Sequence, residues 1–533
     1  MVASRVFSLL VSLFAGLAQA LALATPWDGQ PLWWLQLLAL GVLAGQLSPP
    51  SLTARQAFVT GWVFATAWLV GTFWWLYISM HTYGGLAVPL TVLAIVGLAG
   101  FLALYYAAAC MAYRVLVRTG WAWDAMLFAA LWVLAELARG VWFTGFPWGA
   151  VGYAHVDGPL AAYAPWVGVY GMNALAAVLA MLGAQAVALA VRHGLSRSGL
   201  PVLWIVALLG AVPWGLHTAR EHSNVQAANS AGTLSLTLLQ GNIPQDEKFQ
   251  QGTGVPMALK WYGEQLKAAT TSLVVAPETA IPLLPSDLPA GYLQAIQQHF
   301  DAVQPPQAAL IGIPLGSMAE GYTNSVMGLQ AQSVKPSQVA GQGGYVYSKH
   351  HLVPFGEFIP PLFRWFTALM NIPLGDFNRG DVGQPSFAWQ GQRLAPNICY
   401  EDLFGEEFGA RFIDPALAPT VFVNISNIGW FGDGAVMNQH VQISRLRALE
   451  FARPMVRATN TGATMVIDHQ GVVTASLPRS TRGVLRTEVA GRNGITPFAW
   501  WVSRFGLWPV WLLAGLVVTG AELVRRRRKS SVL

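Results

Sequence analysis

Three reactive side chains lie at the ends of short apolar runs in the second half of this 533-residue sequence. Glu278 ends the run SLVVAPE, Lys349 ends GYVYSK and Cys399 ends LAPNIC. Such runs are typical of strands, and α/β folds gather their chemistry at strand ends. A carboxylate can take the proton of a thiol, the thiolate can attack a carbonyl carbon, and an ammonium can stabilise the oxyanion that forms. These residue types therefore predict a covalent catalyst.

The elements that must position these residues form an α/β pattern. Between residues 233 and 480, short apolar runs alternate with amphipathic stretches, which predicts strands packed under helices. A hairpin with its turn at Asp468–Gly471 comes late in this region. The further strand-like and helical stretches are 233–241, 256–270, 288–300, 308–314, 420–426 and 437–452.

The sequence suggests neither a serine triad nor a set of metal ligands as an alternative catalytic site. His350 and His351 are adjacent, so a strand would point them to opposite faces, which is unfavourable for binding one metal ion. We expect these histidines to shape the loop after Lys349 instead. The sequence implies no metal and no cofactor.

The composition is that of an integral membrane protein. Hydrophobic residues make up 54% of the chain and charged residues 11%, whereas soluble domains carry about 25% charged residues. Residues 1–217 hold 11 of the 31 basic and 25 acidic residues, and most of the others lie in 218–498. The net charge of +6 owes much to Arg525–Lys529 beside an apolar run, which indicates a cytoplasmic membrane anchor rather than nucleic-acid binding.

Eight apolar runs approach the length of about 20 residues that a bilayer-crossing helix needs. The first could instead be a cleaved signal peptide, but the many runs after it favour a retained span. We therefore predict a membrane domain of about seven helices at 1–217, an outer domain at 218–498, and a final helix with a basic tail at 499–533. The eight runs are 6–24, 31–47, 57–78, 86–112, 121–139, 164–191, 199–217 and 499–524.

The positive charges indicate the orientation of these spans. Basic residues lie in every second connection between the spans, and Arg139 is the exception. Connections rich in Lys and Arg stay in the cytoplasm. Both termini are therefore expected in the cytoplasm of a bacterial inner-membrane protein, with the polar domain in the periplasm. The residues that carry this argument are Arg5, Arg55, Arg114, Arg118, Arg192, Arg197 and Arg525–Lys529.

This orientation bears on the two cysteines of the chain. Cys110 lies inside an apolar run and is expected to be a small packing residue. Cys399 would then be alone in an oxidising compartment, with no partner for a disulfide. A free reactive thiol or an intermolecular bridge is expected there, and a buried inert thiol is the alternative.

The segments around the three reactive residues resemble the nitrilase, or carbon–nitrogen hydrolase, superfamily. They are APET with Glu278, YSKHHLVPFGEFIP with Lys349 and NICYED with Cys399. Joined to the predicted spans, and with the segments 136–148, 239–249 and 424–440, they more closely resemble its membrane branch, the apolipoprotein N-acyltransferase family. The resemblance implies an αββα sandwich domain beside a multi-span helical membrane domain.

The resemblance also implies a two-step acyl transfer. Cys399 would attack an acyl ester of a membrane phospholipid, with Glu278 as general base and Lys349 as oxyanion stabiliser. The α-amino group of the diacylglyceryl-modified N-terminal cysteine of an apolipoprotein would then take the acyl group from the thioester. We expect the protein to act as a monomer.

The resemblance assigns supporting and substrate-binding roles to further positions. Phe249 stands where the family often has tryptophan, so an aromatic ring is kept but any hydrogen bond from an indole is lost. Glu357 could instead brace a loop. The supporting positions are Glu357, Tyr400 and Glu401, and the substrate-binding positions are Phe249, Asn324, Trp430 and Phe431.

Several of these features have a structural alternative. Trp430 and Phe431 could be core residues or anchors at the membrane interface. Glu136 and Arg139, three residues apart, could be a structural ion pair. The aromatic segment 140–163 is expected to form an interfacial platform outside the membrane, and the apolar loop 351–366 either a lid or a static cover over the site.

Two rival functions use the same features. A membrane-tethered amidase would use the three reactive residues but admit water to the thioester, releasing free acid from a small amide. A transporter or scaffold with a degenerate domain would line a path across the spans with charged residues. Few such residues occur in the spans, mainly Asp124, Glu136 and Arg139, which argues against a proton-coupled pump.

Overall fold

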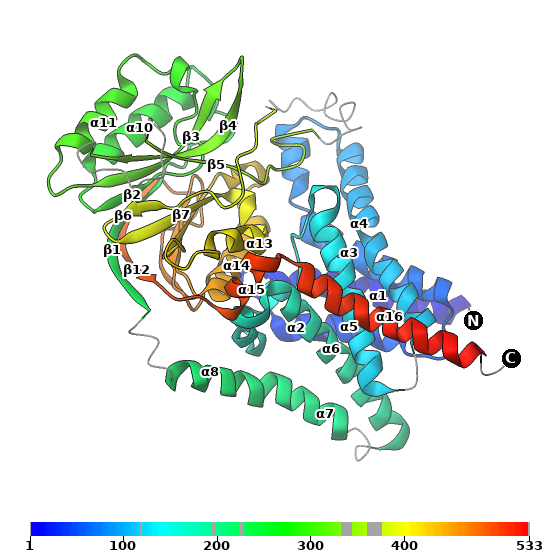
Figure 1. The fold of residues 1–533 in the computed structure, drawn as a ribbon. Helices are drawn as coiled ribbons and strands as arrows, with labels where there is room; N and C mark the ends of the chain where they lie inside the picture. Colours follow the sequence, from blue (N-terminus) through cyan, green and yellow to red (C-terminus); the bar gives the residue numbers. More distant parts are fainter. Residues whose placement is uncertain are drawn as a thin grey trace. The chain divides into compact units, whose positions relative to one another are not determined.

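The computed structural model describes residues 2–117, 120–194, 199–222, 229–331, 344–359 and 376–530 (Figure 1). The chain forms two compact units. The helical unit comprises Met1–Leu76, Val88–Asn224 and Phe505–Leu533, and the sheet unit comprises Tyr77–Ala87 and Val225–Arg504. Arg118, Arg197 and residues 360–366, which belong to the charge and loop arguments above, lie outside the described residues.

The helical unit holds most of the predicted spans. Among the described residues, seven helices are long and apolar enough to cross a membrane, rather than the eight predicted. The predicted second span is a shorter apolar helix, because α2 has 15 residues, against the roughly 20 that a bilayer-crossing helix needs. One of the seven, Gly199–Leu216, runs from α7 through the π-helix Ala207–Ala211 into α8. The α-helices of this unit are α1 (Val2–Leu23), α2 (Trp33–Leu47), α3 (Ala54–Phe73), α4 (Val88–Leu116), α5 (Trp121–Val141), α6 (Ala164–His193), α7 (Gly199–Val206), α8 (Val212–His222) and α16 (Trp508–Ser530).

The last apolar run is divided into two helices. A short helix, α15 (Pro497–Phe505), precedes α16, and Gly506 between them has a left-handed φ of +54° that ends the first helix. Phe498 and Val502 of α15 pack into the core of the sheet unit. The predicted span 499–524 is therefore too early at its start, since apolar composition alone does not separate a core helix from a membrane helix.

Glu136 and Arg139 of α5 form the predicted ion pair, at 2.8 Å. Arg139 also donates to the carbonyl oxygens of Phe146 and Trp148, each at 2.7 Å, in the segment after α5. Most of that segment is buried, and its exposed aromatic surface at the start is limited to Trp142 and Phe143. Few aromatic rings of residues 140–163 are therefore exposed, because Arg139 ties the segment into the interior, and the interfacial platform stays a prediction.

Among the residues that the structure describes, two six-stranded sheets build the sheet unit. The centre of each sheet is parallel and its edges are antiparallel. The first runs β12 (Gly483–Arg492), β1 (Ser230–Gln240), β2 (Leu273–Val275), β3 (Ala308–Ser317), β4 (Gly321–Gln330), β5 (Tyr345–Ser348). The second runs β11 (Val473–Ser476), β10 (Met465–Ile467), β9 (Met455–Thr459), β8 (Val421–Ser426), β7 (Gln392–Ile398), β6 (Phe387–Trp389).

Side chains from the two sheets pack against each other and form the central core. Leu236 of β1 and Val423 of β8 belong to this layer. Leu239 and Val274 point to the opposite face of the first sheet, where they pack against α10 (Gly254–Ala268) and α11 (Tyr292–Ala302). On the other side, α14 (Ala435–Phe451) covers the second sheet (Figure 1). Strands buried on both faces read as continuous apolar runs. The prediction of an αββα sandwich domain together with a multi-helix domain is confirmed.

Candidate active site

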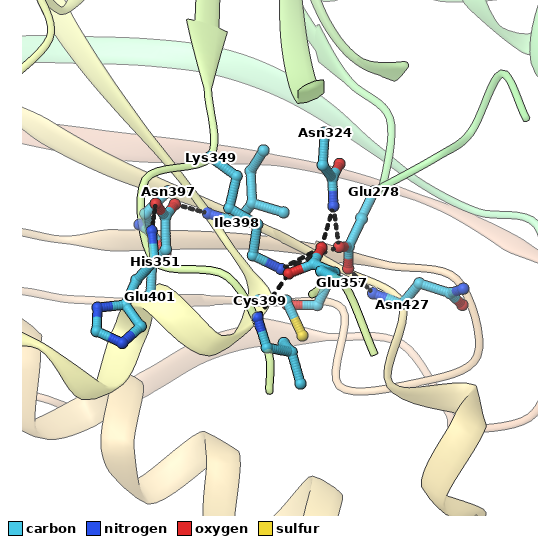
Figure 2. Close-up of polar contacts among 12 residues, drawn as sticks. Glu278, Asn324, Lys349, His351, Glu357, Asn397, Ile398, Cys399, Glu401 and Asn427 are labelled. Atoms are coloured by element: carbon cyan, nitrogen blue, oxygen red, sulfur yellow. Dashed lines mark hydrogen bonds and ion pairs between the residues drawn. The ribbon is translucent and has the colours of Figure 1, made fainter. Parts of the chain in front are cut away.

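Three strand ends position the reactive residues. Lys349 directly follows β5, Cys399 directly follows β7, and Glu278 comes three residues after β2. Although β2 and β5 belong to one sheet and β7 to the other, Figure 2 shows these side chains converging beside the Cys399 sulfur. Spacing along the sequence could not establish this meeting, because it depends on how the two sheets stack.

Lys349 lies between two carboxylates. Its Nζ is 2.9 Å from Glu357 Oε1 and 3.5 Å from Glu278 Oε1, and its side chain is buried. Asn324 Nδ2 donates to the same two oxygens, at 2.7 Å to Glu278 and 2.8 Å to Glu357. Glu357 therefore braces the ammonium as well as its own loop, where Oε2 accepts from the backbone N–H of Val353. Asn324, a substrate-binding candidate by resemblance, contacts the charged groups directly.

The electrostatics of the site keep the lysine charged and the thiol neutral at rest. Burial opposes the charge of Lys349, but Glu357 and Glu278 outweigh it and raise its pKa above the ordinary value. Burial raises the pKa of the Cys399 thiol to about 12, and the Glu278 carboxylate adds to this shift while Lys349 opposes it. A thiol in this state needs a neighbouring base before it can attack.

Cys399 occupies a strained backbone position. Its φ is +53°, a region that residues other than glycine rarely adopt, and it begins the short 3₁₀-helix Cys399–Leu403. Asn424 Nδ2, at 3.4 Å, and His440 Nε2, at 3.1 Å, contact its carbonyl oxygen. Strain of this kind persists where the surrounding contacts hold it, and it is concentrated at functional sites.

Glu401 joins the loop of the lysine to the loop of the cysteine. Its Oε1 accepts from the backbone N–H groups of His350, at 2.7 Å, and His351, at 3.2 Å. Its Oε2 accepts from the Ile398 N–H, at 2.6 Å, and from the Tyr347 hydroxyl, at 2.7 Å. The predicted supporting residue thus fixes the spacing between Lys349 and Cys399, and the two histidines shape the loop after Lys349 as predicted.

The ring of Tyr400, the other predicted neighbour of the nucleophile, is packed inside the sheet unit, and the predicted help of its backbone N–H in stabilising an oxyanion stays a prediction. This buried ring lies against Phe404, with centroids 5.4 Å apart, and against His351, at 5.7 Å. This packing holds the first turn after Cys399.

The predicted aromatic substrate residues form a row of rings in the sheet unit. Phe249 stacks on Trp430 with centroids 6.4 Å apart, and Tyr83 meets Trp430 edge-on at 5.5 Å. Phe431 follows Trp430 in the 3₁₀-helix Ile428–Phe431 and is partly exposed. The sequence analysis missed Tyr83, because it lies between two predicted spans and far from the other motifs.

Other residues of the site were missed although the matching segments contain them. Lys248, inside the segment 239–249, donates from Nζ to the backbone oxygen of Glu278 at 3.0 Å. The backbone N–H of Asn427 donates to Glu278 Oε2 at 2.7 Å. His440 is the last residue of the segment 424–440. These three residues could have been predicted because they lie inside segments that resemble the family. The resemblance does not reveal which atom each of them contacts.

Comparisons with known proteins show which family this chain belongs to. The model of the apolipoprotein N-acyltransferase N-terminal domain matches residues 15–182, and the carbon–nitrogen hydrolase model matches residues 236–493. Apolipoprotein N-acyltransferase from Verminephrobacter eiseniae (strain EF01-2) is 56% identical over 512 residues, covering 93% of this chain and 92% of the relative. The enzyme of that name from Ralstonia nicotianae (strain ATCC BAA-1114 / GMI1000) is 43% identical, covering 93% and 90%.

A solved structure is also similar to this chain. The carbon–nitrogen hydrolase from Helicobacter pylori G27 has 17% sequence identity and a TM-score of 0.34, with 52% of this chain and 94% of that chain covered.

Proposed function

Since the chain belongs to the apolipoprotein N-acyltransferase family, we propose that it moves a fatty acyl group from a membrane phospholipid to the N-terminal amine of an apolipoprotein through a Cys399 thioester. It is an acyltransferase of lipoprotein maturation. The observation that carries the mechanism is the convergence of Glu278, Lys349 and Glu357 beside the Cys399 thiol.

In the first step, Glu278 takes the proton of the Cys399 thiol and the sulfur attacks the ester carbonyl of the phospholipid. The electron pair of the carbonyl bond moves onto oxygen, where the Lys349 ammonium stabilises it. Collapse of this intermediate breaks the ester bond, and the leaving lysophospholipid oxygen receives the proton from Glu278. The neutral resting thiol, with its pKa raised by burial to about 12, makes this proton transfer necessary.

In the second step, the amine of the diacylglyceryl-modified N-terminal cysteine attacks the thioester. Glu278 takes a proton from the attacking nitrogen, Lys349 again stabilises the oxyanion, and the C–S bond breaks. The departing sulfur recovers its proton from Glu278, so the enzyme returns to its starting state with an amide as product. One thiol can thus serve two large lipid substrates in turn.

Supporting residues would position these groups. Glu357 and Asn324 hold Lys349 and Glu278, and Glu401 sets the spacing between the two loops. The rings of Phe249, Trp430 and Phe431 would contact the lipid chains. The protein would act as a monomer and without a cofactor.

The function is tested by where the acyl group goes. Purified protein is given phospholipid with a labelled acyl chain, together with either a diacylglyceryl-modified N-terminal peptide or a soluble small amide. We expect labelled N-acyl peptide as the main product, because the amine competes with water for the thioester. Label found mainly as free fatty acid in the presence of the peptide, together with acid release from the soluble amide, would favour an amidase.

The proposal also includes a topology. The membrane part would comprise residues 1–217, the catalytic part 218–498 in the periplasm, and the final helix and basic tail 499–533, with both termini in the cytoplasm. The alternation of basic loops supports this orientation. A reporter active only outside the cytoplasm should work when fused near residue 300 and fail when fused after Lys529. The opposite pattern would contradict the orientation.

A further inference from the structure

His440 is a buried histidine of α14 that contacts the backbone of the nucleophile and has no part in the two-step mechanism. It is 1% exposed, and its Nε2 lies 3.1 Å from the carbonyl oxygen of Cys399. The backbone of Cys399 has a left-handed φ of +53°, a conformation that persists only where surrounding contacts hold it. The contact from His440 therefore falls on the peptide bond that follows the nucleophile.

The neighbours of the His440 ring determine where its proton lies. Arg457 Nη2 is 3.1 Å from His440 Nδ1. A guanidinium can only donate hydrogen bonds, so Nδ1 is the acceptor and the ring proton lies on Nε2. Burial lowers the pKa of His440 and the charge of Arg457 adds to this shift, although Asp402 opposes it, so the ring is uncharged near neutral pH. His440 Nε2 therefore donates its N–H to the Cys399 carbonyl oxygen.

A buried ion pair holds the His440 ring in this state. Arg457 Nη1 lies 3.0 Å from Asp402 Oδ2, and Ser444, one helical turn further along α14, hydrogen-bonds to both members of the pair. Asp402 Oδ2 lies 3.4 Å from His440 Nε2, farther away than the Cys399 oxygen. These four side chains are buried, and buried charges persist when they are paired and hydrogen-bonded. The ring is thus held by a group with few alternative arrangements.

The Cys399 carbonyl and the Tyr400 N–H belong to one peptide bond. A trans peptide is planar, and its C=O and N–H point in opposite directions. Asn424 Nδ2 also contacts this carbonyl oxygen, at 3.4 Å, so two side chains hold one edge of the peptide plane. Holding that edge sets the direction of the Tyr400 N–H, the group predicted to stabilise the oxyanion. A hydrogen bond to the carbonyl also polarises the peptide and makes its N–H a stronger donor.

We propose that His440 is a positioning residue for the oxyanion: its Nε2–H holds the Cys399 carbonyl so that the Tyr400 N–H, on the opposite edge of the peptide, is aimed at the oxygen that becomes negatively charged. The inference rests on the proposed function, because this oxyanion forms in acyl transfer through Cys399. A donor stabilises an oxyanion only at hydrogen-bond distance from the position that the oxygen takes in the transition state. A peptide held by a rigid buried group meets that requirement.

The test compares two reactions of the Cys399 thiol in the full-length protein. Acylation by phospholipid forms an oxyanion, whereas alkylation by iodoacetamide displaces iodide from a saturated carbon and forms none. In His440→Met, which cannot donate, we expect acylation at saturating phospholipid to slow by about ten- to a hundredfold. The KM for phospholipid and the alkylation rate should stay within a few-fold of normal. His440→Gln places an amide N–H near the position of Nε2 and should restore most of the acylation rate.

Two further variants keep the test decisive. His440→Asn keeps a polar partner for Arg457 but is too short to reach the Cys399 carbonyl, so it takes the place of His440→Met if that variant does not fold. Gln442→Met changes another buried side chain of α14, which contacts Arg445 at 2.9 Å. This control should leave both reactions unchanged.

Equal loss of acylation and alkylation in the folded His440 variants would overturn the inference, since the residue would then position the thiol itself. Normal acylation in His440→Met would overturn it as well, and so would a His440→Gln protein as slow as His440→Met. Glu278→Gln separates this inference from the proposed function. If Glu278→Gln slows acylation and His440→Met does not, the mechanism stands and the role of His440 is wrong. If the unchanged protein forms no acyl adduct on Cys399, the proposed function itself fails.

Discussion

Cys399→Ala is expected to abolish both the acyl-enzyme and the acylated peptide, with a loss of about 10⁴-fold or more in rate. Incubation of the unchanged protein with phospholipid alone should add one fatty-acyl mass to Cys399, and neutral hydroxylamine should remove it. Adding the modified peptide should clear this adduct and give an amide at the peptide N-terminus. The strained φ of +53° and the converging Glu278 and Lys349 are the physical basis for this expectation.

Two further cysteine variants make the result specific. Cys399→Ser should accumulate an acyl ester on the serine, and its acyl group should pass slowly to the amine. An amine attacks an oxygen ester more slowly than it attacks a thioester. Cys110→Ala changes the other cysteine, which is buried in α4, and should keep acyl transfer within a few-fold. Normal transfer by Cys399→Ala, or an adduct on another residue, would exclude the thioester mechanism.

Glu278→Gln is expected to slow Cys399 acylation by about a hundredfold or more, because the buried thiol then lacks a base. Burial raises the pKa of this thiol to about 12, so little thiolate exists near neutral pH. In the variant, the acylation rate should therefore rise by about tenfold for each pH unit between neutral pH and about pH 10, as hydroxide replaces the missing base. Single-turnover acylation over this pH range measures the effect, and the unchanged protein should lack this slope.

The structure supplies matched controls for this substitution. Glutamine has nearly the shape of glutamate, and Lys349 keeps its ion pair with Glu357 at 2.9 Å, so the fold should persist. Glu264→Gln, on the exposed side of α10, should acylate at the normal rate. A Glu278→Gln protein that is fully active near neutral pH would remove this residue from the mechanism.

Long-range pairing explains what the sequence analysis missed in the sheets. Strand β12 is rich in charged residues and pairs with β1, for example Leu485 with Leu238, although about 250 residues separate the two strands. No local periodicity reports that pairing, and β12 was not predicted. The start of the last span was misjudged for a related reason, since apolar content does not show where Gly506 ends α15.

The sequence by itself determined the chemical groups of this protein and the kind of element that carries each one. Glu278, Lys349 and Cys399 stand next to apolar runs, and both the residue type and the run are local properties. The membrane class also followed from composition, because a bilayer imposes length and polarity on each span separately. Similarity of the surrounding segments to a known family added the reaction.

Only the tertiary structure decided how these groups are held. It alone showed that Asn324 contacts both carboxylates, that Glu401 links the two loops, and that Lys248 reaches the backbone of Glu278. Each of these contacts joins residues from different strands or loops, and the contact of Glu401 with the loop of His350 also depends on how the two sheets stack. A hydrogen bond depends on a few tenths of an ångström, and that precision arises from packing rather than from the order of residues along the chain.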